Sequence, residues 1–173
     1  MKPLALLALL LCALPGAGQE VHVSSGKNSV TLAVSAKQPY ALVGIETKVP
    51  TLGVQCSHKG NRSQHLLMFS PGGALVEDTS PDNPKNEQLG LTMTIAGKKQ
   101  ATTWIPYGDV ITFAWYGKTE PERVQFIESL LASSSPTVSI TFTPFLTGVP
   151  TTSVFDLTEL REEIGKHAEC SMK

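Results

Sequence analysis

The sequence lacks the charge pattern that nucleic-acid binding requires. Its 14 Lys and Arg residues are balanced by 15 Asp and Glu residues, so the formal net charge is −1 at pH 7. Proteins that hold a phosphate backbone concentrate positive charge on one surface. The one dense basic stretch is Lys98-Lys99, in a segment typical of a hairpin tip. We therefore expect no nucleic-acid partner.

The motifs of several enzyme classes are also missing. The chain has no G-x-S-x-G segment, and no glycine-rich phosphate loop follows a predicted strand. A nucleophilic hydrolase needs an activated Ser or Cys within reach of a histidine, whereas the four histidines here stand singly. These features favour a protein that is not an enzyme and uses no cofactor.

Apolar runs long enough to cross a bilayer, which takes about 20 residues, are absent as well. The run Leu4–Leu14 follows the cationic Lys2 and precedes the small residues of Gly16–Gly18, an order typical of a cleaved signal peptide. We predict a signal peptide over residues 1–18 and a single domain over residues 19–173. This domain would be periplasmic or secreted, with no membrane span after cleavage. An uncleaved membrane anchor and a lipoprotein acylated at Cys12 are the alternatives.

Cysteine is scarce, with three residues in the chain, and cleavage would leave Cys56 and Cys170. Thiols that reach an oxidising compartment tend to form disulfides. We predict a Cys56–Cys170 bond that closes a loop of 114 residues (170 minus 56), for which chain entropy gives at most about 4–5 kcal/mol. A metal site at Cys56, His58 and His65 is the alternative. Its spacing lacks the usual paired ligands, so we expect no metal.

The chain does contain a series of β-strand patterns separated by turn residues. In Ser29–Ser35 the apolar residues occupy alternate positions, so one face of this strand should be buried. Similar patterns occur in Leu52–Ser57, Leu89–Ile95 and Val138–Thr143. Seven to nine short strands at near-regular spacing predict a mainly β fold, an antiparallel β-sandwich.

In two segments the spacing of the apolar residues is that of an α-helix. Thr119 and Glu122 have the spacing of a capping box, Pro121 suits the first turn, and an apolar stripe follows as far as Ser133. Asp156 can cap a second helix at the end of the chain. The apolar stripe of that helix consists of Leu157, Leu160, Ile164 and Ala168. The predicted sandwich therefore has one inserted helix and a C-terminal helix.

Both tryptophans and two of the three tyrosines fall within residues 104–116. Aromatic side chains with a polar tip are favoured in half-wet cores and at binding surfaces. We predict a binding surface at Trp104, Tyr107 and Trp115. The alternative, which their strand spacing favours, is that they lie in the core.

Several short segments resemble the VasI family of exported bacterial proteins associated with type VI secretion. These segments are Thr51–Cys56, Phe126–Leu131, Thr143–Phe145 and Phe155–Leu160, followed by Cys170. The resemblance covers residues 30–170. It implies that Cys56 and Cys170 match the cysteine pair of the family, and it carries over no catalytic residue.

These observations lead to two functional hypotheses. The first is a non-enzymatic periplasmic or secreted accessory domain that binds a protein or an envelope polymer. It would be associated with a secretion system or with envelope assembly. The second is a secreted hydrolase that acts on a glycan or peptide through acidic loop residues. The candidates for that role are Asp78, Asp82, Glu87 and Asp109, of which two lie in the predicted exposed loop Ser80–Glu87.

Overall fold

The computed structural model describes residues 20–41, 47–59, 62–73, 88–107, 109–117, 119–144 and 146–171. The predicted signal peptide and the predicted loop Ser80–Glu87 lie outside these ranges. None of the helices in the described part of the chain has the length and apolarity needed to cross a membrane.

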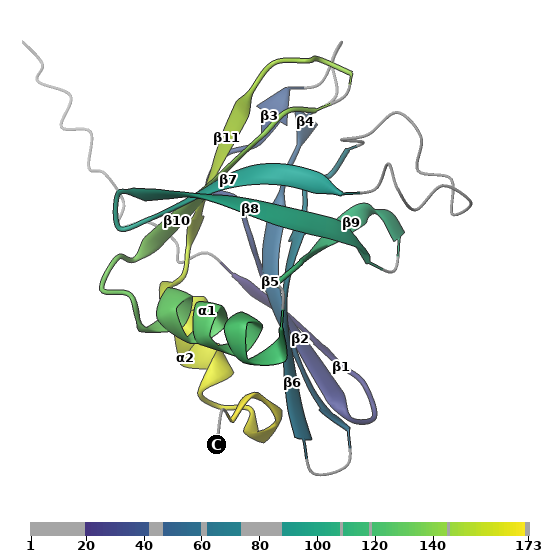
Figure 1. Ribbon diagram of the computed structural model, residues 1–173, viewed down its shortest axis with the longest axis vertical. Helices are drawn as coiled ribbons and strands as arrows, with labels where there is room; N and C mark the ends of the chain where they lie inside the picture. Colours follow the sequence, from purple (N-terminus) through teal and green to yellow (C-terminus); the bar gives the residue numbers. More distant parts are fainter. Residues whose placement is uncertain are drawn as a thin grey trace, which may run out of the picture.

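The predicted mainly β, antiparallel fold with two helices is confirmed (Figure 1). One sheet has nine strands, and every neighbouring pair in it is antiparallel. In spatial order it consists of β1 (Val21–Ser25), β2 (Ser29–Ser35), β5 (Thr51–Lys59), β6 (Arg62–Ser70), β9 (Asp109–Trp115), β8 (Lys98–Tyr107), β7 (Leu89–Ile95), β10 (Thr137–Phe142) and β11 (Thr151–Asp156). The short strands β3 (Tyr40–Ala41) and β4 (Thr47–Lys48) pair separately.

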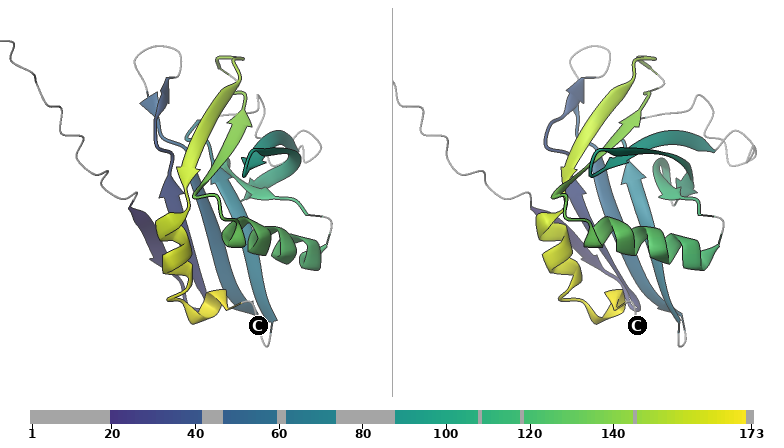
Figure 2. Two further views of the ribbon diagram at one scale, coloured as in Figure 1. Left: turned by 90° about the vertical axis from the view of Figure 1, so that its left-hand side faces the viewer. Right: turned by 60° about the vertical axis from the view of Figure 1, so that its left-hand side comes forward.

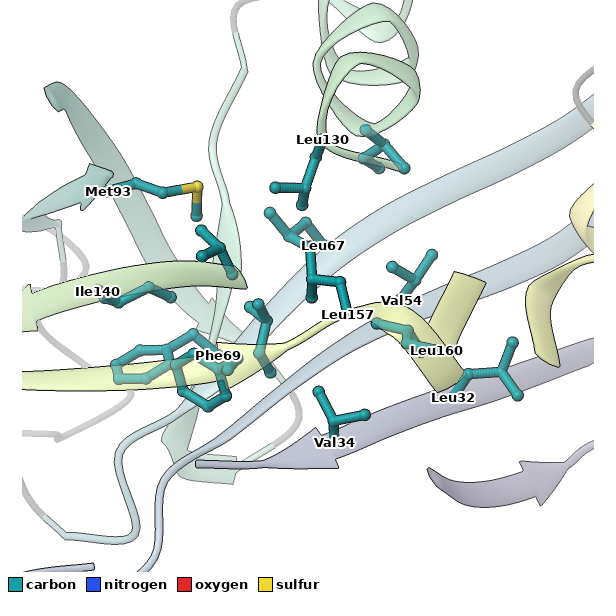
Figure 3. Close-up of a cluster of buried hydrophobic side chains, with 14 of the residues drawn as sticks. Leu32, Val34, Val54, Leu67, Phe69, Met93, Leu130, Ile140, Leu157 and Leu160 are labelled. Carbon is teal, nitrogen blue, oxygen red and sulfur yellow. The ribbon is translucent and has the colours of Figure 1, made fainter. Parts of the chain in front are cut away.

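The sheet folds back on itself, so its two halves face each other across one core (Figure 2). Phe69 of β6 shows this most directly. Its ring lies 5.3 Å from that of Phe142 and 6.3 Å from that of Phe155, although β10 and β11 stand at the far end of the strand order. Figure 3 shows these facing layers, with side chains from both halves meeting around Phe69.

The alternation predicted for Ser29–Ser35 explains one face of this core. Val30, Leu32 and Val34 are buried, and the residues between them are half-buried. The turn between β7 and β8 is also where the sequence predicts it. Ala96 and Gly97 there have φ of 48° and 77°, the left-handed values that a two-residue hairpin turn requires.

The helices cover the lower part of strands β2, β5 and β6 (Figure 2). Helix α1 (Glu120–Ala132) buries Phe126, Ile127 and Leu130, and helix α2 (Thr158–Ile164) buries Leu160 and Ile164. The second helix is shorter than its predicted stripe, because it ends at Gly165. Ala168 therefore lies outside it, in the separate 3₁₀ turn η2 (Ala168–Cys170).

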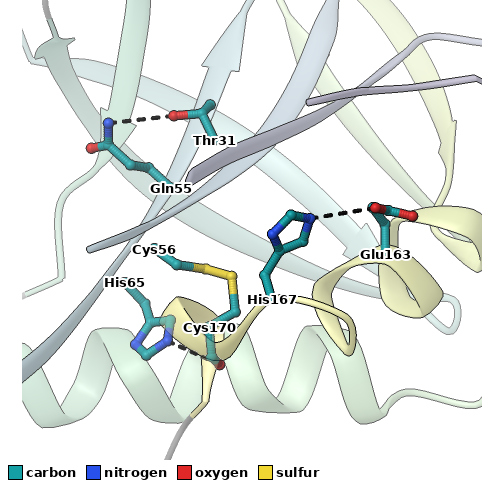
Figure 4. The surroundings of a disulfide bond; sticks show 7 residues. All are labelled: Thr31, Gln55, Cys56, His65, Glu163, His167 and Cys170. Carbon is teal, nitrogen blue, oxygen red and sulfur yellow. Dashed lines mark hydrogen bonds and ion pairs between the residues drawn. A yellow bond between two sulfur atoms is a disulfide. The ribbon is translucent and has the colours of Figure 1, made fainter. Parts of the chain in front are cut away.

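The predicted cysteine pair is present, and it attaches η2 to β5 (Figure 4). The Cα atoms of Cys56 and Cys170 lie 5.0 Å apart, and both residues are buried. His65 pairs with Cys56 across β5 and β6, and its Nε2 lies 3.3 Å from the carbonyl oxygen of Cys170. The end of the chain is thus held against the middle of the sheet.

Asp156, the predicted cap of the C-terminal helix, lies one residue before the N-cap of α2, which is Leu157. Its carboxylate accepts hydrogen bonds from the backbone N–H of Thr158 at 3.0 Å and from its hydroxyl at 2.7 Å. The carboxylate also lies 3.0 Å from Nζ of Lys37. Burial alone would raise the pKa of Asp156. The hydrogen bonds from Thr158 and the ammonium group of Lys37 outweigh that effect, so this pKa lies below its ordinary value.

Removal of the disulfide should lower the free energy of unfolding by about 2–5 kcal/mol, because the cross-link restricts the unfolded chain. Urea unfolding of Cys56→Ala, Cys170→Ala and the double variant, all under oxidising conditions, measures this loss. Each single variant should lose as much as the double variant, since either one breaks the same bond. Identical urea midpoints for the oxidised and the reduced wild-type protein would contradict the prediction.

Replacement of the carboxylate in Asp156→Asn should cost about 0.5–1 kcal/mol at pH 7, the range of a partly exposed, hydrogen-bonded ion pair. Because the folded pKa lies below the unfolded value of about 3.9, this stabilisation is complete above the unfolded value. It is lost as the pH falls through the folded pKa. Urea unfolding from pH 7 to pH 2 should show the difference between the two proteins shrinking once the pH falls below about 4. A difference that does not change with pH would rule this out.

Candidate binding site beside helix α1

The site is built around the connection from β9 to α1. Trp115 ends β9, and the backbone N–H of Tyr116 still donates to the carbonyl oxygen of Thr103 on β8, at 2.8 Å. Helix α1 begins soon afterwards with the predicted capping box. The hydroxyl of Thr119 accepts from the backbone N–H of Glu122 at 3.4 Å and donates to its carboxylate at 3.0 Å. The strand therefore passes into the helix through a short turn.

Gly117 makes this turn possible. A Cβ at this position would lie 2.5 Å from Cγ of Arg123 and 2.8 Å from the ring of Trp115. Arg123 also donates from Nη1 to the carbonyl oxygen of Gly117 at 3.3 Å. The absent side chain lets the first turn of α1 approach the end of β9 closely.

This close approach stacks Trp115 on Phe126 of α1. The ring centroids lie 4.3 Å apart, and the planes differ by 21°. Trp115 is half-buried, whereas the next residue, Tyr116, is 51% exposed. A fixed aromatic pair thus lies beside an exposed tyrosine.

A first groove, of about 510 Å³, runs between β8 and α1. Its walls carry amide, hydroxyl and carboxylate groups next to the aromatic rings. The lining residues are Gln100, Ala101, Thr102, Thr103, Trp115, Tyr116, Gly117, Glu122, Gln125, Phe126 and Ser129. A groove of this size and mixed character suits a ligand that has apolar faces and several hydrogen-bonding groups.

A second groove, of about 400 Å³, lies where β6 and β9 separate. Strand β9 pairs with β6 at Met68 and Phe69, and the preceding part of β6 lines this groove instead. The lining residues are Gln55, Ser57, Gln64, His65, Leu66, Ile105, Ala114, Trp115, Tyr116, Glu120 and Arg123. Trp115 and Tyr116 therefore belong to both grooves.

His65 lines the second groove, but its ring nitrogens are buried. Its side chain is buried, and Nδ1 has no hydrogen-bond partner among the described residues. When Nε2 donates to the carbonyl oxygen of Cys170, Nδ1 is an acceptor.

The structure separates the three residues of the predicted binding surface. Trp104 is 0% exposed, and its Nε1–H donates to the hydroxyl of Thr102 at 2.7 Å. It lies in the core, where it cannot touch a partner, so the candidate site does not include it. Tyr107 ends β8, but its side chain is not among those that the structure describes. Trp115 lines both grooves, and the sequence reasoning missed its exposed neighbour Tyr116.

The alternative metal site is not formed. Cys56 is bonded to Cys170, so it has no thiolate to offer a metal. Within the described ranges, no three His, Cys, Asp or Glu residues are grouped so that they could hold a metal ion. Asp78, Asp82 and Glu87, and the side chain of Asp109, fall outside the described part, so the acidic residues of the hydrolase hypothesis stay untested.

No protein-family model matches the chain, and neither a curated protein nor a solved structure matches it. The resemblance to the VasI family therefore stays a prediction.

Gly117→Ala should destabilise the protein by about 1–3 kcal/mol, because the new methyl group must displace Arg123 or the Trp115 ring. Urea unfolding measures this cost. Gly90→Ala in β7 is the matched control, since a Cβ there meets nothing within 4 Å. It should leave the stability unchanged or slightly higher. Equal effects of the two substitutions would contradict the close approach at Gly117.

Proposed function

We propose that this protein is a non-enzymatic, exported binding domain that holds a glycan polymer of the cell envelope beside helix α1. The observation that carries the proposal is the shared position of Trp115 and Tyr116, which line grooves of about 510 and 400 Å³. A chain molecule that crosses Tyr116 can place successive units in the two grooves.

The chemistry of the groove walls supports a glycan. Sugar rings present apolar C–H faces that pack on aromatic rings, and their hydroxyl groups need donors and acceptors around them. The first groove offers the amides of Gln100 and Gln125 and the hydroxyl of Ser129 beside the aromatic residues. The second offers the exposed amide of Gln64 and the hydroxyl of Ser57.

The disulfide supports export, because such bonds form and persist in oxidising compartments. The predicted signal peptide also supports export. The resemblance to the VasI family supports an envelope location beside a secretion system. In this proposal the domain is an accessory factor that recognises the polymer and leaves it intact.

Sedimentation with purified, protease-treated, insoluble cell-wall glycan tests the proposal. Tyr116→Ala combined with Gln125→Ala should weaken retention about tenfold or more, since an aromatic residue at the centre of an interface contributes most of its affinity. Leu146→Ala is the control, because Leu146 is 60% exposed and lines neither groove. Circular dichroism should show all variants folded.

Three outcomes would overturn the proposal. Unchanged retention of the folded double variant would remove the grooves from the binding surface. Retention on untreated cell wall but not on the protease-treated glycan would indicate a protein partner. Release of soluble sugar fragments by the wild-type protein would make it a hydrolase.

A further inference from the structure

Strand β1 forms one edge of the nine-stranded sheet (Figure 1). It pairs with β2 along its whole length, and on its other side its backbone makes no hydrogen bond to any described residue. The outer side of an edge strand carries a row of N–H and C=O groups that can pair with a further strand. The side chains from His22 to Ser25 are all exposed. This edge is therefore accessible to another chain.

The opposite edge of the sheet, at β11, is protected. The backbone N–H of Lys37 donates to the carbonyl oxygen of Val154 at 2.8 Å, and Nζ of Lys37 lies 3.0 Å from the carboxylate of Asp156. Natural sheets protect their edges with such contacts, or with charged residues, prolines and bulges inside the edge strand. Strand β1 contains no charged residue and no proline, and its register with β2 has no shift. It thus lacks the features within a strand that keep other strands away.

Charges of opposite sign lie at the two ends of β1. Glu20 precedes the strand, and Lys27 follows it in the turn to β2. Both residues are exposed, and neither forms an ion pair with a described residue. Two copies of this strand side by side in parallel would bring like charges together. In an antiparallel pair, each Glu20 approaches Lys27 of the other copy, so the ends attract twice.

The side chains of β1 also match a second copy of the strand when Val23 lies at the two-fold axis. In this register Val23 faces Val23 of the other copy, and His22 faces Ser24. Val21, on the same face as Val23, is half-buried and packs against the core, whereas Val23 is 46% exposed. A second copy covers this exposed valine with its own valine and extends the apolar face of the sheet.

We propose that β1 is a self-association edge, at which two copies of this protein pair antiparallel through Val21–Ser25 and form a symmetric dimer. The two sheets continue into each other across the two-fold axis. One pair of five-residue strands buries less surface than a standard interface of about 1,600 Å², so the dimer is weak and reversible. The edge shares no residue with the grooves beside α1, and the inference does not depend on the proposed glycan binding.

Sedimentation equilibrium of the protein purified after export tests this inference. Between about 10 μM and 1 mM, where weak interfaces associate, the average mass should rise from that of the monomer towards that of the dimer. Val23→Lys should weaken association about tenfold or more, because it places two like charges at the two-fold axis.

Val149→Lys is the matched control for this substitution. Val149 is 60% exposed and lies between β10 and β11, so this variant should associate as the wild type does. Circular dichroism should show both variants folded. Equal effects of the two substitutions would overturn the proposal. A wild-type protein that is monomeric at every concentration would leave the edge to a strand of another protein, and this would overturn it too.

Reversal of the end charges tests the antiparallel arrangement. Glu20→Lys and Lys27→Glu should each weaken association about tenfold, because two attractive pairs become two repulsive pairs. An equal mixture of the two variants should associate as strongly as the wild type, since each approach again joins opposite charges. The double variant should do the same on its own. A mixture or a double variant that associates no better than the single variants would overturn the proposal, even if Val23→Lys does not fold.

Val23→Cys gives a direct readout of the register. Mild oxidation should join two copies at this position, because residues directly opposite each other on antiparallel strands lie close enough for a disulfide. Ser25→Cys should cross-link much less, since Ser25 faces Val21 of the other copy. Non-reducing gel electrophoresis measures both products. Equal cross-linking at the two positions, or none at Val23→Cys, would overturn the proposed pairing.

Discussion

The packing of Phe69 against the far half of the sheet is the interaction on which the rest of the structure depends. Its ring contacts those of Trp104, Phe142 and Phe155, which belong to β8, β10 and β11. Because these strands follow β6 in one continuous sheet, the sheet must curve until its ends approach each other. This curvature produces both the enclosed core and the separation of β6 from β9 beside α1. Burial of apolar surface thus fixes where a ligand can enter.

Much of the fold could be predicted because the deciding signals are local. The alternation in Ser29–Ser35 and the capping box of Thr119 and Glu122 each concern only a few neighbouring residues. The disulfide follows from a simple count, because the predicted cleavage leaves two cysteines. The end of the C-terminal helix was harder to predict, since the apolar stripe continues past the residue where the helix stops. Gly165 ends the helix, and Cys170 then needs its own turn to reach β5.

The candidate site could be predicted only in part, because it forms between distant segments. Trp104 and Trp115 are direct partners across β8 and β9, so their side chains share one face of the sheet. Sequence cannot tell which of them lies deeper. The difference arises because Trp104 packs against Phe69 in the core, whereas Trp115 packs against Phe126 of α1. Nor does any local pattern bring Gln125 of α1 to Gln100 of β8. The aromatic cluster therefore predicts the region of the candidate site but only some of its residues.

Arg161 of α2 has a consequence for the first groove. Its guanidinium donates to the carbonyl oxygens of Leu130 in α1 at 3.2 Å and of Ser135 just beyond that helix at 2.7 Å. The C-terminal helix thereby holds the last turn of the helix that forms one groove wall. Since the disulfide holds the chain end that follows α2, reduction of this bond would act on that groove wall through the contacts of Arg161 with α1. A reducing environment would then loosen this wall of the first groove.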